Sequence, residues 1–357
     1  MLLANDSTDL KPTVTLSVLK FAGSVLFFFV GLRLLASSFS WADVILVGLE
    51  TEPFVCFFSA LILSAVLQSH ALSVCVLCAL GANHYLGLEE LVYMLLGSNL
   101  GSTISGSLSR LGRFSGKKEF KRGLTVLLSN HFVKLLMVLF FFPLEYYWKV
   151  LSRSAAFIQL PSIQWFENWP SPLAVVQLFF LFLGLFLLHV SFLLYRQSST
   201  WVLLSQSSLI PAKETFASEY KTFILGIQLA FLYQSSGAAR AQVLSSVARR
   251  DLNLKKVFPF ILGNNLGITG AGLLAAVCFL EQPHVMALVI LNILINTVWS
   301  GLFMIFSWLR EMPIEAAKWI SDTSTEYKLI GFTYVLLVFF LLPFLFIFGS
   351  VKGFDLL

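Results

Sequence analysis

Two clusters of polar side chains interrupt strongly apolar stretches of the sequence, and both have the chemistry of an ion site. They lie at 68–69 in LQSHALS and at 234–236 in YQSSGAA, and Arg240 follows the second. A helix that begins at such a cluster points its free N–H groups and partial positive charge at a ligand. The serine hydroxyls add donors and acceptors beside it. This chemistry suits an oxyanion such as phosphate or sulfate.

A second pair of motifs offers ligands for a small cation. GSNLGST at 97–103 and GNNLGIT at 263–269 each place two glycines around an asparagine. Paired glycines weaken the interior of a helix and free carbonyl oxygens there, so we expect broken helices near 91–109 and 257–279. Carbonyl, amide and hydroxyl oxygens suit sodium. An anion site and a cation site would then be neighbours.

These polar motifs recur at a single offset along the chain. Gln68 and Gln234 are 166 residues apart (234 − 68), and the same offset relates the two glycine-asparagine motifs to each other. It also relates Asn130 to Asn296. One such match could arise by chance, but three in the same register predict a duplicated unit.

The elements that position these motifs must be membrane helices. Of the 357 residues, 57% are hydrophobic and 12% are charged, and the mean hydropathy of +0.84 is far above that of soluble domains. The net charge of +5, carried in short loops, fits a membrane orientation signal rather than nucleic-acid binding. We expect an integral, multi-pass protein of the plasma or inner membrane, surrounded by lipid. The predicted spans lie near 14–37, 91–109, 123–145, 172–195, 257–279, 285–309 and 329–349.

Loop charges predict that the two halves lie in the membrane with opposite orientations. The loop 110–122 carries six Lys or Arg residues, whereas the only charged residue of its repeat partner, 276–288, is acidic. In the other pair, 249–256 is basic and 83–90 carries two glutamates. Because Lys and Arg in short loops mark the cytoplasmic side, the halves must be inverted.

If the two halves are inverted, one segment in each half must enter and leave the membrane on the same side. We expect re-entrant helical hairpins near 56–82 and 222–248. Their arms of about 13 residues would reach only about 20 Å, which is short of a hydrocarbon core of about 30 Å. Non-helical backbone at membrane depth is tolerated where protein encloses it or where it lines a watery cavity. The hairpin tips should therefore meet and line a site near the bilayer midplane.

The predicted fold is an all-α polytopic membrane protein with two inverted-topology repeats, each holding a re-entrant hairpin and a broken transmembrane helix. Repeat 1 covers 14–145 and repeat 2 covers 172–309. Between them, the aromatic-rich segment 146–171 is expected to be an extracellular or periplasmic interfacial loop. The remainder, 310–357, is expected to be a cytoplasmic connection followed by a final transmembrane helix.

A QSS-type tip paired with a GxNxGxT element in each half resembles the type II sodium/phosphate cotransporter family. The resemblance covers about 14–309 and includes FVGLRLL at 29–35, which is similar to the first helix of the family. The chain resembles a bacterial-type member of the family, without a PhoU-like soluble domain. It implies a secondary active transporter that takes up phosphate with sodium, with no enzymatic activity and no cofactor. Its partners would be phosphate and sodium, and a homodimer is compatible with it.

By this resemblance the two tips bind the transported ions. The expected anion ligands are Gln68, Ser69, His70, Gln234, Ser235, Ser236 and Arg240. The expected sodium ligands are Ser69, Asn99, Thr103, Ser235, Asn265 and Thr269, with Asn130 and Asn296 as further candidates.

Both tips depart from the family pattern of successive serines, which keeps alternatives open. His70 and Ala71 stand in the first tip and Gly237 in the second, so fewer hydroxyls remain for sodium. Proton coupling through His70, or transport of another oxyanion, is one alternative. Arg240 is either a fixed charge that holds the anion or an arginine that snorkels or pairs within the bundle. An anion channel and an intramembrane enzyme are further alternatives, although the sequence has no HExxH signature.

Other polar residues are expected to have structural roles. His131 and His189 should hydrogen-bond within the bundle, and Arg33 should extend to the membrane interface. Cys75 and Cys78 form a CxxC without a second ligand pair, and we expect them to pack as small residues.

Overall fold

The chain folds into helices throughout the part that the structure describes. This computed structural model describes residues 14–39, 52–82, 86–103, 116–156, 174–205, 213–249, 251–326, 333–334 and 336–351. Within these ranges no strand is present. Five helices are long and apolar enough to cross a membrane, at Thr15–Ser38, Lys117–Trp148, Val176–Ser199, Leu254–Cys278 and Pro283–Ile305. The protein is an integral, multi-pass helical membrane protein.

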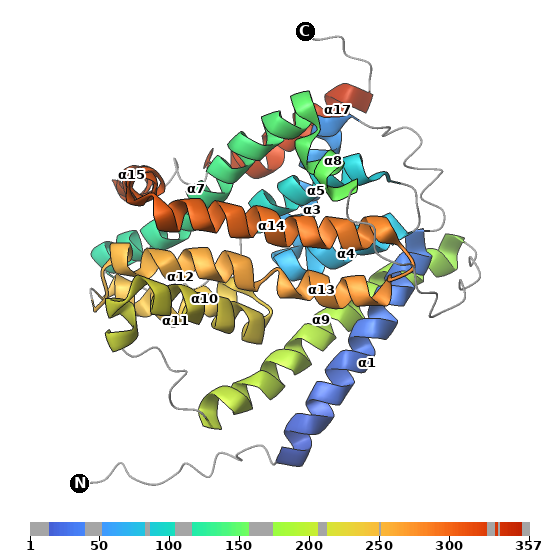
Figure 1. Cartoon of the computed structure of the whole chain (residues 1–357), viewed down its shortest axis with the longest axis horizontal. Helices are drawn as coiled ribbons and strands as arrows, with labels where there is room; N and C mark the ends of the chain where they lie inside the picture. The colour runs from blue at the N-terminus through green and yellow to red at the C-terminus, as the bar shows by residue number, and fades with distance from the viewer. Residues whose placement is uncertain are drawn as a thin grey trace.

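Figure 1 shows the order of the helices along the chain. The first half contains α1 (Val14–Ser38), α3 (Pro53–Leu67), α4 (His70–Ala82), α5 (Leu88–Gly101), α7 (Lys117–Trp148) and α8 (Val150–Ala156). The second half contains α9 (Ala174–Ser205), a short 3-10 turn at Lys213–Ala217, α10 (Glu219–Tyr233), α11 (Ser236–Ala248), α12 (Leu254–Gly267), α13 (Gly270–Cys278) and α14 (Pro283–Ile305). It is followed by α15 (Ser307–Glu326), a π-helical turn at Leu337–Leu341 and α17 (Leu342–Val351).

Helix boundaries in the two halves follow the offset found in the sequence. The starts of α10, α11 and α12 lie 166 residues after those of α3, α4 and α5 (219 − 53, 236 − 70, 254 − 88), and their ends agree in the same way (233 − 67, 248 − 82, 267 − 101). The starts of α14 and α7 have the same separation (283 − 117). Both short helix pairs turn through a left-handed glutamine, Gln68 at φ 50° and Gln234 at φ 45°. The agreement supports the predicted duplication.

The matched helices form two groups. In Figure 1, α10, α11 and α12 lie together at one end of the molecule, α3, α4 and α5 lie toward the other, and α14 runs past both groups. The long helices α1 and α9 pack along each other. In each group the first helix lies directly on the third, because Gly97 of α5 faces the Phe57 carbonyl of α3 and Gly263 of α12 faces the Phe223 carbonyl of α10.

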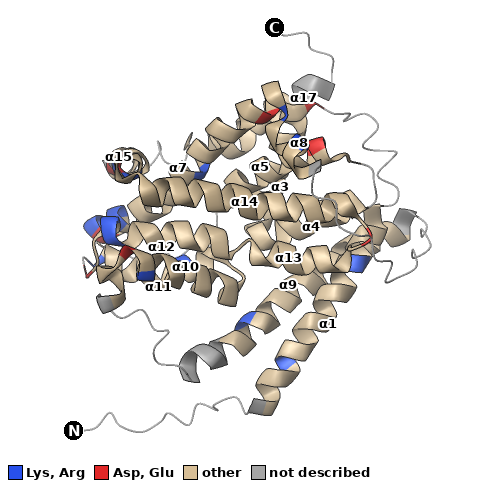
Figure 2. Cartoon of the chain, in the orientation of Figure 1, with Lys and Arg blue, Asp and Glu red and all other residues tan. Residues whose placement is uncertain are grey.

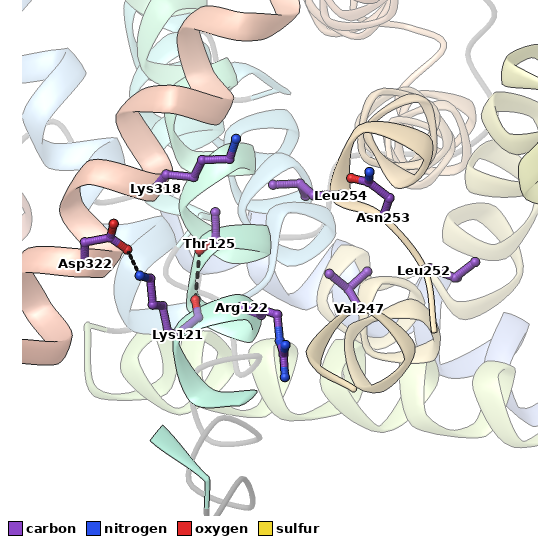
Figure 3. Close-up of a pocket in the computed structure, with 9 residues that line it drawn as sticks. All are labelled: Lys121, Arg122, Thr125, Val247, Leu252, Asn253, Leu254, Lys318 and Asp322. Carbon is purple, nitrogen blue, oxygen red and sulfur yellow. Dashed lines mark hydrogen bonds and ion pairs between the residues drawn. The ribbon is translucent and has the colours of Figure 1, made fainter. Parts of the chain in front are cut away.

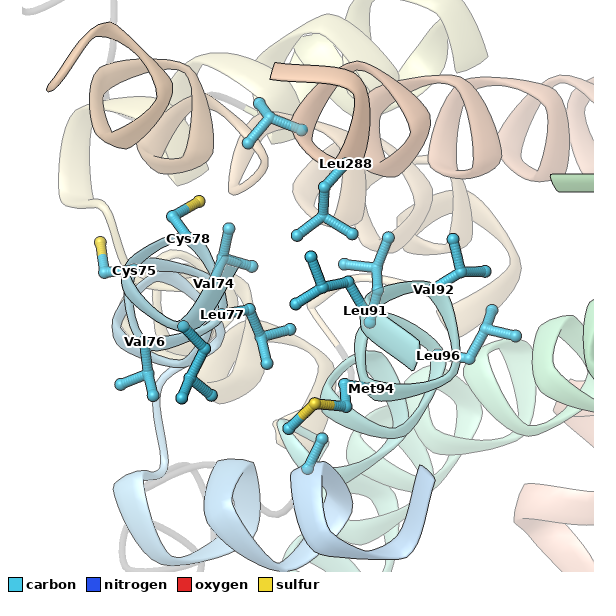
Figure 4. Packing of buried hydrophobic residues seen from close by; sticks show 14 of the residues in the cluster. Val74, Cys75, Val76, Leu77, Cys78, Leu91, Val92, Met94, Leu96 and Leu288 are labelled. Atoms are coloured by element: carbon cyan, nitrogen blue, oxygen red, sulfur yellow. The ribbon is translucent and has the colours of Figure 1, made fainter. Parts of the chain in front are cut away.

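Aliphatic side chains fill the space between α4, α5 and α14. Figure 4 shows Cys75 and Cys78 of α4 beside Val74 and Leu77, with Leu288 of α14 nearby. Both thiols are free and fully buried. They pack as small apolar residues, as the sequence suggested.

The basic residues gather at one end of the helices. In Figure 2 the ribbon positions of Lys and Arg gather around the end of α11 and the starts of α12 and α7, with a few acidic positions among them, whereas further acidic positions lie near α8 at the opposite end. This distribution agrees with the loop charges from which opposite orientations of the two halves were inferred.

The structure departs from the sequence expectations at two segments. The expected loop 146–171 begins as helix, because α7 continues to Trp148 and α8 follows. The buried Glu145 carboxylate accepts hydrogen bonds from the backbone N–H groups of Leu151 and Ser152 and so stabilises the start of α8. The connection after 309 is the helix α15, which packs against α7. Residues 157–171 lie outside the described ranges.

Arg33 of α1 contacts residues that lie far away in the sequence. Its guanidinium donates to the Cys278 carbonyl at 2.7 Å and pairs with Glu281 at 3.1 Å, and it lies over the Phe279 ring. The side chain therefore ties α1 to the end of α13, a partner 248 residues away in the sequence.

The predicted helix breaks are visible in part. In the second motif α12 ends at Gly267 and α13 begins at Gly270, with a turn between them. In the first motif α5 ends at Gly101 and a turn follows at 102–103, while residues 104–109 of the expected broken helix lie outside the described ranges.

We predict that Gly97→Ala destabilises the fold by about 1–3 kcal/mol, because a Cβ there overlaps the Phe57 backbone and forces α3 and α5 apart. Gly263→Ala should have the same effect through Phe223. Thermal unfolding of the purified protein measures the loss. Gly301→Ala is the matched control, because nothing lies within 4 Å of its added Cβ, and it should be neutral or slightly stabilising.

Candidate ion-binding site

The tips of the two short helix pairs line one cavity of about 300 Å³. Gln68 and Ser69 come from the α3–α4 turn, and Gln234 and Ser235 come from the α10–α11 turn. Residues 166 positions apart in the sequence therefore meet at one place. Four of the seven predicted anion ligands are brought together by this cavity.

Local hydrogen bonding explains why each tip ends one helix and starts the next. The Ser69 hydroxyl oxygen accepts from the Leu72 backbone N–H at 3.3 Å, and the Ser235 hydroxyl oxygen accepts from the Ala238 N–H at 3.2 Å. Both serines thus cap helices, α4 and α11, that start at the cavity. Each hydroxyl keeps its own proton for donation, and the remaining N–H groups of the first turn give the site a partial positive charge.

The other three predicted anion ligands are not among the described residues that line the cavity. His70 is buried, and its Nε2 lies 3.4 Å from Nδ2 of Asn292 on α14. Ser236 is buried, and its carbonyl accepts from Asn264 at 3.2 Å. Arg240 is only 1% exposed, inside α11.

A buried lysine that sequence reasoning missed occupies the predicted cation ligands of the first half. Lys134 of α7 is 3% exposed, and its ammonium donates to Asn99 Oδ1 at 2.7 Å and to Asn296 Oδ1 at 2.6 Å. Among the described residues, none of the ion pairs includes Lys134. The available signal was a single lysine within the apolar run 123–142, since ionisable residues inside membrane spans are rare and mark functional positions.

The surrounding amides are oriented by their own hydrogen bonds. The Asn99 Nδ2 donates to the Leu95 carbonyl at 3.0 Å and to Asn292 Oδ1 at 3.3 Å. The Asn296 Nδ2 donates to the Asn292 carbonyl at 2.8 Å and to Asn292 Oδ1 at 3.0 Å. With both amide nitrogens engaged, the two amide oxygens face Lys134. Three helices, α5, α7 and α14, thus converge on one positively charged group.

The candidate threonines lie at the ends of α5 and α12. Thr103 donates to the Leu100 carbonyl and Thr269 donates to the Leu266 carbonyl, each at 2.7 Å. Thr103 also lies 2.8 Å from His131 Nδ1, and the His131 Nε2 lies 2.6 Å from the Tyr334 hydroxyl. His131 therefore has the structural role expected of it.

Helices α7 and α12 and the α10–α11 turn hold buried polar atoms that no donor or acceptor satisfies within the described part of the chain. They include the amide oxygens of Asn130, Asn264 and Gln234 and the amide nitrogen of Asn265. All four residues are at most 4% exposed. A buried oxygen without a donor is destabilising unless a ligand or water satisfies it, so these oxygens mark a place for a cation or a protonated oxyanion.

Two residues of α9, His189 and Arg196, also line the cavity between the tips. We expected His189 to be structural and did not single out Arg196. The sequence signal for Arg196 was a charge that ends an apolar span, which usually indicates only a position at the membrane interface. Its place beside the tips follows from the packing of α9 against α10 and α4.

A larger, basic cavity of about 580 Å³ lies at the end of the molecule where positive charges gather. Figure 3 shows its lining, to which α7 contributes Lys121 and Arg122 and α15 contributes Lys318 and Asp322. Lys121 pairs with Asp322, so the lining keeps an excess of positive charge. Such a cavity attracts anions to this face.

The chain is similar to curated sodium-dependent phosphate transport proteins over a little more than a third of its length. Over 130 residues the chain is 32% identical to sodium-dependent phosphate transport protein 2C of Rattus norvegicus, a match that covers 35% of this chain and 21% of that protein. It is 26% identical over 137 residues to transport protein 2A of Ovis aries, covering 37% and 21%. It is 27% identical over 143 residues to transport protein 2B of Homo sapiens, covering 39% and 20%.

Over this stretch the chain is similar to the sodium-dependent phosphate transport proteins. The resemblance drawn from the paired motifs is thereby confirmed. The match spans about a fifth of the length of these sodium-dependent phosphate transport proteins. No family model and no solved structure matches the chain.

We predict that Ser69→Cys and Ser235→Cys, combined in one chain, are joined by a short bifunctional thiol reagent, because both side chains face the same cavity. Mass spectrometry of the linked peptides measures the yield. The native cysteines are buried and should react little. Val66→Cys with Ser235→Cys is the control: Val66 is 64% exposed, so its cysteine should react alone without linking. Equal yields for the two pairs would contradict the shared cavity.

Proposed function

We propose that the chain is a secondary active transporter that couples sodium entry to the uptake of inorganic phosphate, and that it is not an enzyme. The site is formed by the two opposed tips near the bilayer midplane. The single observation that carries this proposal is the shared cavity of Gln68, Ser69, Gln234 and Ser235. The relatives named for sodium-dependent phosphate transport point to the same ions.

The architecture that goes with this function is a pair of inverted repeats, 14–145 and 172–309, each with a re-entrant hairpin. The helix pairs α3–α4 and α10–α11 are the hairpins. Their arms have 15 and 13 residues in both cases, or about 20–23 Å at 1.5 Å per residue, which is less than a full crossing. Matched helix boundaries and the basic end of the molecule support this reading.

Phosphate is held at the tips by donors that converge from both halves. The first turns of α4 and α11 present backbone N–H groups, and the two capping serines present hydroxyl protons. Arg196 adds a positive charge at the cavity wall, and Arg240 adds a buried one in α11. Together these groups balance the charge of an oxyanion, and no carboxylate is among the described residues that line the cavity.

Sodium binds beside the anion, at the broken helix of the second half. Thr269 and the side-chain amide of Asn265 are the proposed ligands there, and the buried Gln234 Oε1 and Asn130 Oδ1 are acceptors without donors in the described chain. Ser69, Thr103 and Ser235 are the remaining candidates. Neutral oxygens of this kind coordinate sodium in transporters built from broken helices.

One observation favours proton coupling as a second candidate. His70 and Lys134, both titratable, are linked by hydrogen bonds through Asn292 and Asn99. A proton taken up or released by either group changes the charge of this network while the same tips bind phosphate or another oxyanion. Replacing sodium by choline under an imposed pH step separates the two couplings, since only a proton-coupled transporter keeps its uptake.

We predict that the purified chain in proteoliposomes takes up labelled phosphate when sodium is imposed outside, to a level well above empty vesicles and against a phosphate gradient. Uptake that only follows the electrochemical gradient would indicate a channel instead. Sulfate is the competing oxyanion to include. Absence of uptake by protein that is demonstrably folded would refute the proposed function.

We predict that Arg240→Ala lowers the initial rate of phosphate uptake by about tenfold or more, because a charge-assisted hydrogen bond contributes about 1.5–3 kcal/mol. Arg249→Ala is the matched control, since Arg249 is exposed at the end of the same helix. Size-exclusion chromatography checks assembly of both variants. A rate for Arg240→Ala equal to that of the control would assign the buried arginine to packing alone.

A further inference from the structure

We propose that the Lys134 ammonium is a tethered cation that fills, in the first half, the position that sodium takes in the second half. The inference rests on the proposed function and deepens it, because it states how many sodium ions the chain can bind. Lys134 thereby lowers the number of sodium ions that accompany each phosphate by one.

Geometry around Lys134 is that of a cation site already occupied. The oxygens of Asn99 and Asn296 converge on one nitrogen at 2.7 and 2.6 Å, while both amide nitrogens are turned away by hydrogen bonds of their own. A site built to hold an uncharged or anionic group would turn the amide nitrogens inward. The charge is balanced by neutral oxygens alone, as it is for sodium in a transporter.

The matching position in the second half has the same amides without the lysine. The offset of 166 relates Asn99 to Asn265 (265 − 99), Asn296 to Asn130 (296 − 130) and Lys134 to Ser300 (300 − 134). Ser300 is buried, and its hydroxyl donates to the Leu262 carbonyl at 3.3 Å. No ammonium replaces the cation here.

Unsatisfied oxygens lie where the lysine is missing. Asn130 Oδ1, the counterpart of Asn296 Oδ1, is buried without a donor in the described part of the chain. Asn265, the counterpart of Asn99, leaves its Nδ2 without an acceptor, and the neighbouring Asn264 leaves its Oδ1 without a donor. In the other set, Asn99 Oδ1 and Asn296 Oδ1 both bind Lys134. The helices that carry the unsatisfied oxygens, α7 and α12, pack against each other. The two halves therefore offer similar oxygens, and one set is filled by a side chain while the other needs a free ion.

A tethered cation changes transport in a specific way. Sodium leaves with the phosphate, but an ammonium stays with the chain and returns with the empty site. The fixed charge thus helps to neutralise the anion without contributing to the driving force. Lys134→Ser reproduces the residue of the second half and should open a further site for sodium.

The first test measures sodium binding through stability, in the absence of phosphate. Purified full-length protein is melted in sodium chloride and in choline chloride at equal ionic strength. Lys134→Ser should melt several degrees lower than the parent in choline and regain most of that loss in sodium, because an ion that binds only the folded state stabilises it. Lys118→Ser, an exposed lysine on the same helix, should show the parent's smaller sodium effect. An equal sodium effect in Lys134→Ser and the parent overturns the inference.

The converse variant keeps the test decisive if Lys134→Ser does not fold. Ser300→Lys places an ammonium among the oxygens of the second half and should remove the sodium-dependent stabilisation of the parent. A Ser300→Lys protein that keeps the full sodium effect also overturns the inference.

The second test measures phosphate uptake against sodium concentration. In Lys134→Ser the Hill coefficient for sodium should rise by about one, whereas Lys118→Ser should leave it unchanged. An unchanged Hill coefficient in Lys134→Ser overturns the tethered-cation role. So does phosphate uptake that a proton gradient drives in the parent and that Lys134→Ser loses. If no variant transports phosphate but the melting results hold, the proposed substrate fails while the role of Lys134 stands.

Discussion

A polar group that leaves water needs a partner inside the protein, and the structure around the tips depends on this constraint. Each unpaired backbone group in hydrocarbon costs several kcal/mol. Glycines allow α3 to lie on α5 and α10 to lie on α12 at backbone distance, and serine caps satisfy the first amides of α4 and α11. Enclosure by neighbouring helices makes a turn at that depth possible. The same enclosure leaves a cavity between the two turns where an ion can replace water.

Local signals in the sequence predicted the fold well, because helix boundaries depend on nearby residues. Apolar runs, glycine-asparagine motifs and polar tips located the helices, and the offset of 166 recurred in their boundaries. Contacts between distant helices could not be predicted in this way. Lys134 of α7 contacts Asn99 and Asn296 only because α5 packs against α7 and α14 packs against α5. Arg33 contacts Glu281, which is 248 residues away in the sequence.

The tips illustrate both outcomes within a few residues. Gln68 and Ser69 line the cavity as their position at the turn suggested, whereas His70, the first residue of α4, contacts Asn292 of α14 instead. Successive residues at the start of a helix point in different directions, about 100° apart, so neighbours in sequence need not share a site. In the proposed repeat, positions 166 residues apart have matched helix boundaries but different side chains, such as Lys134 and Ser300.

Gln68 and Gln234, at the two tips, have a left-handed backbone conformation that lowers the stability of the fold. A residue with a Cβ loses about 1–2 kcal/mol in this conformation, and glycine would adopt it freely. Both turns nevertheless carry glutamine. In the second turn the Gln234 amide nitrogen donates to the Phe231 carbonyl at 2.9 Å, which holds the buried Oε1 as an acceptor without a donor in the described chain. Strain of this kind persists where the surrounding structure enforces it and function uses it. Under the proposed function, an ion that binds the Gln234 Oε1 would compensate for this strain, whereas a glycine in the same turn would offer no side-chain oxygen.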